Sequence, residues 1–246
     1  MLLAAGGAGC GDDGEVAGEQ ETGETAVIDP GDNGVYAPTI DPANFVDTID
    51  NPYLPYASGA RWVIEVENDD GETEIITVEV LDERRDVMGV STVVVHDVVA
   101  IEGEVIEDTY DWYAQDVDGN VWYFGEDTTS YEDGEVSTDG SWEAGVDGAL
   151  PGIVMLADPK VSDTGYRQEF LAGEAEDMGQ VVRVGERVEL ELGTYDDVIV
   201  TVDWTPLEPD VVEEKYYAPG VGFVQEIKVA GGTDVGVLVE YEPGVG

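Results

Sequence analysis

The chain has 246 residues, of which 42% are hydrophobic, so it is long enough and apolar enough to bury a core. It carries 57 Asp and Glu residues against 9 Lys and Arg residues, which gives a formal net charge of -48. A surface this negative repels phosphate backbones, which excludes nucleic acid as a direct partner, and it disfavours adsorption on anionic lipids. The acids are either the hydrated surface of a salt-adapted protein or a set of ligands for Ca²⁺.

The N-terminal segment, residues 1–10, ends in the lone cysteine of the chain, Cys10. A short stretch of small apolar residues precedes Cys10 and an acidic run follows it. This arrangement resembles the end of a bacterial lipoprotein signal peptide, whose cysteine is lipidated. The resemblance implies export to the cell envelope or cell surface and a lipid anchor at Cys10; the alternative is a chance cysteine. A single cysteine also excludes an intramolecular disulfide and a cysteine-based zinc site.

Two further segments follow. Residues 11–38 are rich in Gly, Asp, Glu and Thr, with few large apolar side chains, and this composition predicts an acidic flexible tether. Residues 39–246 are expected to form a single β-rich domain. Its first part, residues 41–56, places large apolar side chains among prolines, which favours an irregular lead-in packed on the domain.

From residue 61 onward the hydrophobic pattern has a period of two, which is typical of strands with one buried face. No long window has a helical stripe, and only residues 148–157, which are apolar, could form one short helix or a loop that plugs the core. We therefore predict an all-β fold: a curved antiparallel meander, closed as a barrel, half-barrel or sandwich, with little helix. The expected strands cover residues 61–67, 76–80, 90–101, 104–115, 121–125, 180–192, 198–204, 211–217, 223–229 and 235–241.

The hairpin around Asp118 and Gly119 gives the first candidate site. With a two-residue loop, Asp111 lies directly opposite Glu126 and Tyr113 lies opposite Phe124. Like charges at opposed positions destabilise a sheet, so the pair needs a cation, a shared proton or a basic neighbour, for which the candidates are Arg84, Arg85 and Arg167. The hypothesis is a site for Ca²⁺ or another hard cation, with Asp108 and Asp127 as further ligands. A glycine bulge would shift the register and dissolve the pair.

The same hairpin carries the aromatic residues Trp112, Trp122 and Tyr123. Aromatic rings beside carboxylates hold sugar rings or lipids in many proteins, so these residues are candidate ligand contacts. Aromatic residues are also favoured in the core of a β-sheet, which is the competing interpretation.

Catalytic signals are weak. Paired carboxylates could hydrolyse glycosides, but among 57 acids a nearby pair carries little information. His96 is the only histidine, which excludes a histidine-based metal cluster, and its neighbour Asp97 points to the other face of the strand. We assign no catalytic residue, and a glycoside hydrolase-like enzyme is kept only as an alternative.

Residues 216–224, YYAPGVGFV, place a Pro-Gly turn between two strands. This hairpin resembles the closing hairpin of bacterial envelope lipoproteins of unassigned function that are built on curved antiparallel sheets. The resemblance covers only this hairpin and the Cys10 region, and it implies a fold and a location. The sequence therefore predicts an exported, membrane-tethered lipoprotein with a non-catalytic binding role for Ca²⁺ or another cation, or alternatively for a lipid or carbohydrate.

Overall fold

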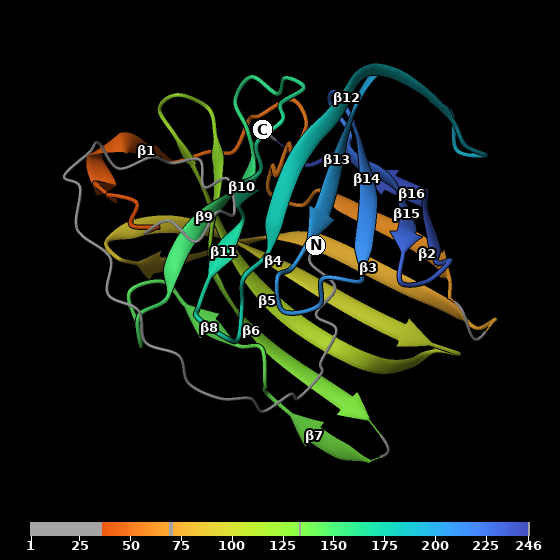
Figure 1. The fold of residues 1–246 in the computed structure, drawn as a ribbon, viewed down its shortest axis with the longest axis horizontal. Coiled ribbons are helices and arrows are strands. Elements are labelled where there is room, and N and C mark those ends of the chain that lie inside the picture. The colour runs from red at the N-terminus through yellow and green to blue at the C-terminus, as the bar shows by residue number, and fades with distance from the viewer. Residues whose placement is uncertain (1–35, 69–70, 133, 246) are drawn as a thin grey trace.

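The computed structural model describes residues 36–68, 71–132 and 134–245, which form an almost entirely β structure (Figure 1). The prediction of an all-β antiparallel fold is confirmed: the strands belong to one 16-stranded sheet, and helix in the described part of the chain is limited to the 3-10 turn η1 (Pro42–Asn44). The strands are β1 (Phe45–Val46), β2 (Arg61–Glu67), β3 (Thr73–Val87), β4 (Val90–Ile101), β5 (Glu104–Asp116), β6 (Val121–Glu132), β7 (Glu135–Ser137), β8 (Trp142–Glu143), β9 (Leu150–Met155), β10 (Tyr166–Arg167), β11 (Glu169–Phe170), β12 (Met178–Glu189), β13 (Thr194–Trp204), β14 (Val212–Ala218), β15 (Gly222–Ala230) and β16 (Val235–Glu242).

The sheet curls into a nearly closed barrel. Its strand order is β10-β12-β13-β14-β15-β16-β2-β3-β4-β5-β6-β9-β11, so neighbours in sequence are mostly neighbours in space. Figure 1 shows β3 to β6, in yellow and green, facing β12 to β15, in teal and blue, across the interior. The two ends of this order meet at Gln168, because β10 immediately before it pairs with β12 and β11 immediately after it pairs with β9. A five-residue segment, 166–170, therefore closes the barrel.

The irregular lead-in packs on the domain, as the sequence predicts, and it does so at one end of the barrel. The Asn51 side-chain amide donates to the carbonyl oxygens of Gly119 at 2.9 Å and Leu156 at 3.1 Å. The Gly220 N–H donates to the carbonyl oxygen of Pro52 at 2.7 Å. The lead-in is thereby bonded to the β5–β6 turn and to the β14–β15 turn. Two residues after Pro52, the side chain of Leu54 is buried.

Tyr36 falls within the segment that the sequence assigns to the tether, and it packs on the barrel. Its side chain is buried, and its hydroxyl donates to the carbonyl oxygen of Pro151 at 2.8 Å. Cys10 and the remainder of the expected signal peptide and tether lie outside the described residues. Among the residues that the structure describes, no helix has the length and apolar character needed to cross a bilayer.

The β5–β6 hairpin has the predicted pair but a different turn. Asp111 lies opposite Glu126, as expected, but Tyr113 lies opposite Tyr123 rather than Phe124. The prediction of a two-residue loop is wrong. The Asp116 N–H donates to the Asn120 carbonyl oxygen, so the turn between these two residues contains three residues.

A bulge in β6 then shifts the register by one residue between Tyr113 and Asp111. Gly125 lies at this bulge with φ of 131°, and a Cβ there would approach the Trp142 carbonyl oxygen to 2.2 Å. The bulge therefore restores the Asp111–Glu126 pair that the turn alone would have removed.

Candidate ligand-binding site in the barrel interior

Strand alternation separates the predicted cation ligands. Asp111 and Glu126 face the interior, whereas Asp108 and Asp127 occupy positions of the opposite face. Asp108 lies 3.0 Å from the His96 ring, and Asp127 is exposed. Within the described ranges, no cluster of three or more His, Cys, Asp or Glu side chains is placed to hold a metal ion.

The predicted aromatic contacts are also divided between the two faces. Trp112 lies beneath the Arg85 guanidinium, 3.9 Å from its carbon to the ring centroid. The Trp122 indole donates to the Asp116 carboxylate at 2.8 Å. Tyr123 alone faces the interior, where it is fully buried. The three rings therefore do not form one binding surface.

The Asp111–Glu126 pair is joined by a tyrosine. The Tyr123 hydroxyl lies 2.6 Å from Asp111 Oδ1 and 3.0 Å from Glu126 Oε2. A phenol has one proton to donate, so only one carboxylate can accept from it and the other carboxyl must carry a proton. Burial, followed by the charge of Asp111, raises the pKa of Glu126 well above its usual range. The sequence allows a cation, a basic neighbour or a shared proton to stabilise this pair, and the geometry favours the shared proton.

Other buried acids continue this group. Burial raises the pKa of Asp97 to about 8 and the pKa of Glu169 well above its ordinary value. Glu169 accepts a hydrogen bond from the Trp142 indole at 3.1 Å, and nearby acids raise its pKa further. We call Asp97, Asp111, Glu126 and Glu169 the protonated acid group, since burial raises the pKa of each of them and one carboxyl of the Asp111–Glu126 pair carries a proton.

A second set of acids surrounds a lysine on β13, β14 and β15. Lys215 Nζ lies 3.4 Å from Asp203 and 3.7 Å from each of Glu213 and Glu226, and its side chain is 4% exposed. Burial alone lowers the pKa of Lys215, but these three carboxylates raise it well above its ordinary value. Burial raises the pKa of Glu226 to about 7, although Lys215 lowers it. We call these four residues the lysine-centred group.

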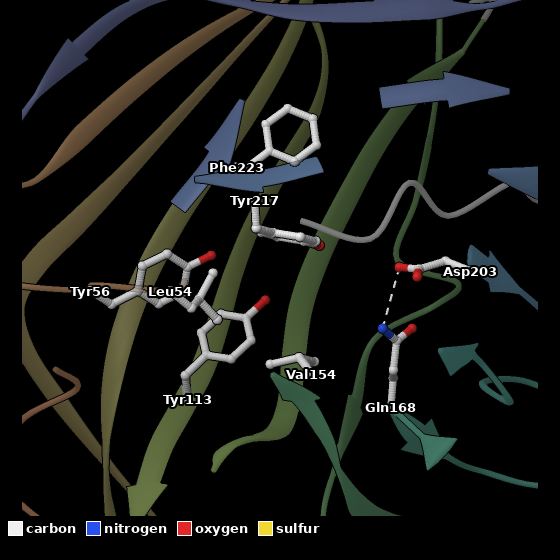
Figure 2. A pocket seen from close by; sticks show the side chains of 8 residues that line it. All are labelled: Leu54, Tyr56, Tyr113, Val154, Gln168, Asp203, Tyr217 and Phe223. Atoms are coloured by element: carbon white, nitrogen blue, oxygen red, sulfur yellow. Dashed lines mark hydrogen bonds between the residues drawn. The ribbon is translucent and has the colours of Figure 1, made fainter. Parts of the chain in front are cut away.

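Beside the lysine-centred group, with Asp203 in its wall, lies a pocket with about 410 Å³ of empty space, part of it open to solvent. An adjoining pocket of about 260 Å³ shares Leu54, Tyr56 and Phe223 with the first. Figure 2 shows Gln168 and Asp203 together on one side, with the hydroxyl groups of the tyrosines turned toward them. The first pocket is lined by Leu54, Tyr56, Tyr113, Val154, Gln168, Asp203, Tyr217 and Phe223, and the second adds Trp62, Ile64 and Val78. One end of the combined cavity is polar and the other is apolar.

The polar end contains hydrogen-bond acceptors that lack partners. The Gln168 side-chain amide donates to Asp203 Oδ2 at 3.3 Å, which fixes the nitrogen of that amide on the Asp203 side. Gln168 Oε1 and Asp203 Oδ1 are both buried and have no hydrogen-bond partner. An unpaired buried acceptor is destabilising, so these atoms mark a place where a donor from a ligand or from water would bind favourably.

Sequence reasoning missed Gln168, Asp203, Lys215 and Glu226. A signal was present for Lys215 and Asp203, because period-two alternation on β13 and β14 places both on the buried face. Gln168 had no comparable signal, since it lies between two strands of two residues each.

No family model matches this chain, and no curated protein matches it. Three solved structures are similar. A presumed exported protein with a YmcC-like fold from Bacteroides fragilis is 16% identical with a TM-score of 0.41, over 77% of this chain and 98% of that one. A presumed lipoprotein from Parabacteroides distasonis is 13% identical with a TM-score of 0.45, over 80% and 100%. A β-barrel-like protein of the domain of unknown function DUF1849 from Brucella abortus is 12% identical with a TM-score of 0.40, over 76% and 98%. At these values the similarity transfers no ligand or activity to this chain.

Proposed function

We propose that this chain is an exported lipoprotein of the bacterial cell envelope, anchored through Cys10, whose barrel interior binds a small ligand without transforming it. The location rests on the resemblance of the Cys10 region to a lipoprotein signal peptide. The binding role rests on the cavity inside the barrel. The two parts can be tested separately, because ligand binding inside the barrel does not require the lipid anchor.

The observation that carries the binding role is the pair of adjoining pockets that share Leu54, Tyr56 and Phe223. A cavity with an apolar end and a few polar groups at the other end fits an amphipathic molecule, such as a short lipid or a sugar with an apolar substituent. The lead-in supplies Leu54 and Tyr56, so part of the cavity wall comes from outside the long strands.

A neutral fluorescent probe tests this proposal. N-phenyl-1-naphthylamine should bind with one-to-one stoichiometry and gain fluorescence inside the apolar end, because its emission rises when it leaves water. Leu54→Trp fills that end and should abolish the signal, whereas Leu207→Trp, at a side chain that is 44% exposed, should leave it intact. Equal signals from the two folded variants, judged by circular dichroism, would contradict interior binding.

Calcium is a second candidate ligand, which would take the place of the proton between the opposed carboxyl groups of Asp111 and Glu126. Thermal unfolding in millimolar CaCl₂ should then have a higher midpoint than in KCl of matched ionic strength. Asp111→Asn combined with Glu126→Gln should remove the increase. If only molar KCl raises the midpoint, the acidity is a salt adaptation and the calcium proposal fails.

A further inference from the structure

We propose that the ligand of the interior cavity is an organic cation with N–H donors, an alkylammonium or a related amine, whose charged end binds Gln168 and Asp203. The inference rests on the proposed interior binding function and names the ligand class for the same cavity. Its apolar part would lie against Leu54 and Phe223.

The hydrogen-bonding requirement comes from the unpartnered atoms of the polar end. Gln168 Oε1 and Asp203 Oδ1 are acceptors, so a ligand group that binds them must donate a hydrogen bond. Gln168 is 3% exposed and Asp203 is 7% exposed, so bulk water does not readily satisfy them. An ammonium group has three donors and no acceptor, and its hydrogen bonds to a carboxylate are stronger than those between neutral groups.

The charge requirement comes from the lysine-centred group. Lys215 faces the carboxyl groups of Asp203, Glu213 and Glu226, so the acids outnumber their central cation. The lysine lies on the Oδ2 side of Asp203, which leaves Oδ1 for a second donor. A carboxylate or phosphate ligand would meet this excess of negative charge and be repelled.

The aromatic lining agrees with a cationic ligand. The rings of Tyr56, Tyr113, Tyr217 and Phe223 line the same pocket as Asp203. The π faces of such rings attract ammonium groups, and aromatic residues beside a carboxylate are a recurrent arrangement for organic cations. Figure 2 shows the three tyrosines grouped opposite Asp203.

The neighbouring acids make binding depend on pH. A bound cation favours the ionised form of a nearby carboxyl group, and burial holds the pKa of Glu226 at about 7. Binding at pH 7 should therefore release protons, and affinity should increase between pH 6 and pH 8. Isothermal titration calorimetry in buffers of different ionisation enthalpy measures this release directly.

The deciding experiment compares three ligands of equal chain length on the full chain in molar KCl, which screens the surface charges. Displacement of N-phenyl-1-naphthylamine at pH 8 should be about tenfold more effective with n-pentylammonium than with 1-pentanol. Pentanoate should not displace the probe. Asp203→Asn should remove the preference for the ammonium, whereas Asp210→Asn, at an exposed loop position, should keep it.

The outcomes separate this inference from the proposed function. If the probe binds but pentanol displaces it as well as pentylammonium does, the assignment of a cationic ligand is wrong and the proposal of interior binding stands. If the probe itself does not bind, the proposed function fails. Should Asp203→Asn not fold, Gln168→Met removes the other acceptor at similar length and should weaken pentylammonium several-fold relative to pentanol. An unchanged preference in that variant would overturn the inference.

Discussion

The barrel interior holds two groups of buried acids that differ in how their charge is handled. The lysine-centred group on β13 to β15 surrounds Lys215 with carboxyl groups at 3.4 to 3.7 Å. In the protonated acid group on the facing wall, the Tyr123 hydroxyl joins Asp111 and Glu126, and one of these two carboxyl groups carries a proton. A nearby cation favours the ionised form of a buried acid and opposes the effect of burial on its pKa, as Lys215 does for Glu226, whereas acids that share protons lose stability when those protons are removed. Buried acids of the same residue types therefore respond differently to the same solvent.

Removing the lysine should have the largest effect. Lys215→Met leaves three acids around a neutral side chain, and breaking a buried ion pair in this way typically reduces the free energy of unfolding by about 3–5 kcal/mol. The matched control is Lys228→Met, because Lys228 pairs with Asp234 where its side chain is 21% exposed. There we expect about 1 kcal/mol or less. Urea denaturation at pH 8 measures both values.

The Lys215→Met loss should be smaller at pH 5 than at pH 8, since the pKa of Glu226 is about 7 and this acid is then protonated. A variant that loses equal stability at both pH values would show that Lys215 acts through packing rather than charge.

The protonated acid group should dominate the pH dependence. Burial raises the pKa of Asp97 from 3.8 to about 8, so between these values the native state holds a proton that the unfolded state has released. The contribution of this residue to the free energy of unfolding is therefore largest below pH 4 and is lost as the pH rises to about 8. Asp97→Asn should reduce the loss between pH 5 and pH 8 by on the order of 3 kcal/mol, measured by urea denaturation in molar KCl.

The control for this experiment is Asp82→Asn, which removes an exposed charge from β3. It should leave the slope of stability against pH nearly unchanged. If the two variants flatten the slope equally, the pH dependence arises from general surface repulsion and not from the buried acid.

The smallest expected change in stability comes from Glu126→Gln, and it tests whether Glu126 is protonated. In Glu126→Gln the side-chain amide can donate to the Tyr123 oxygen as the protonated acid does, so stability at pH 5 should stay within about 1 kcal/mol of the parent. Tyr123→Phe removes both hydrogen bonds of the bridge and should reduce stability by about 1–3 kcal/mol. Thermal unfolding at pH 5 compares the two. A larger loss in Glu126→Gln than in Tyr123→Phe would mean that Glu126 is ionised there.

The sequence predicts the strand content well because alternation is a local property of each segment. It predicts residues 148–157 poorly, since an apolar run with no alternation fits a helix, a loop or a strand, and the structure forms β9 there with Pro151 in the strand. The opposed pair Asp111 and Glu126 was predicted from the wrong loop length. The pair exists because of the Gly125 bulge, whose position depends on the close contact with Trp142.

The interior site was only partly predictable for a related reason. Its residues come from strands that are distant in sequence, and Gln168 reaches the site because the barrel closes there. No local pattern shows which strands will face each other across a barrel. Strand alternation indicates that Lys215 is buried, but the acids of β13 and β15 that surround it depend on the sheet order.

The pairing of β2 with β16 determines when the sheet can be completed. Strand β2 (Arg61–Glu67) pairs with β3 on one side and with β16 (Val235–Glu242) on the other. Its second side is therefore paired only after β16 has been synthesised. A nascent chain that ends before β16 leaves the backbone groups of one side of β2 unpaired, and contacts this distant in sequence make folding slow. Synthesis must therefore reach β16 before the barrel can close, and a truncation that removes β16 would leave an open sheet edge prone to aggregation.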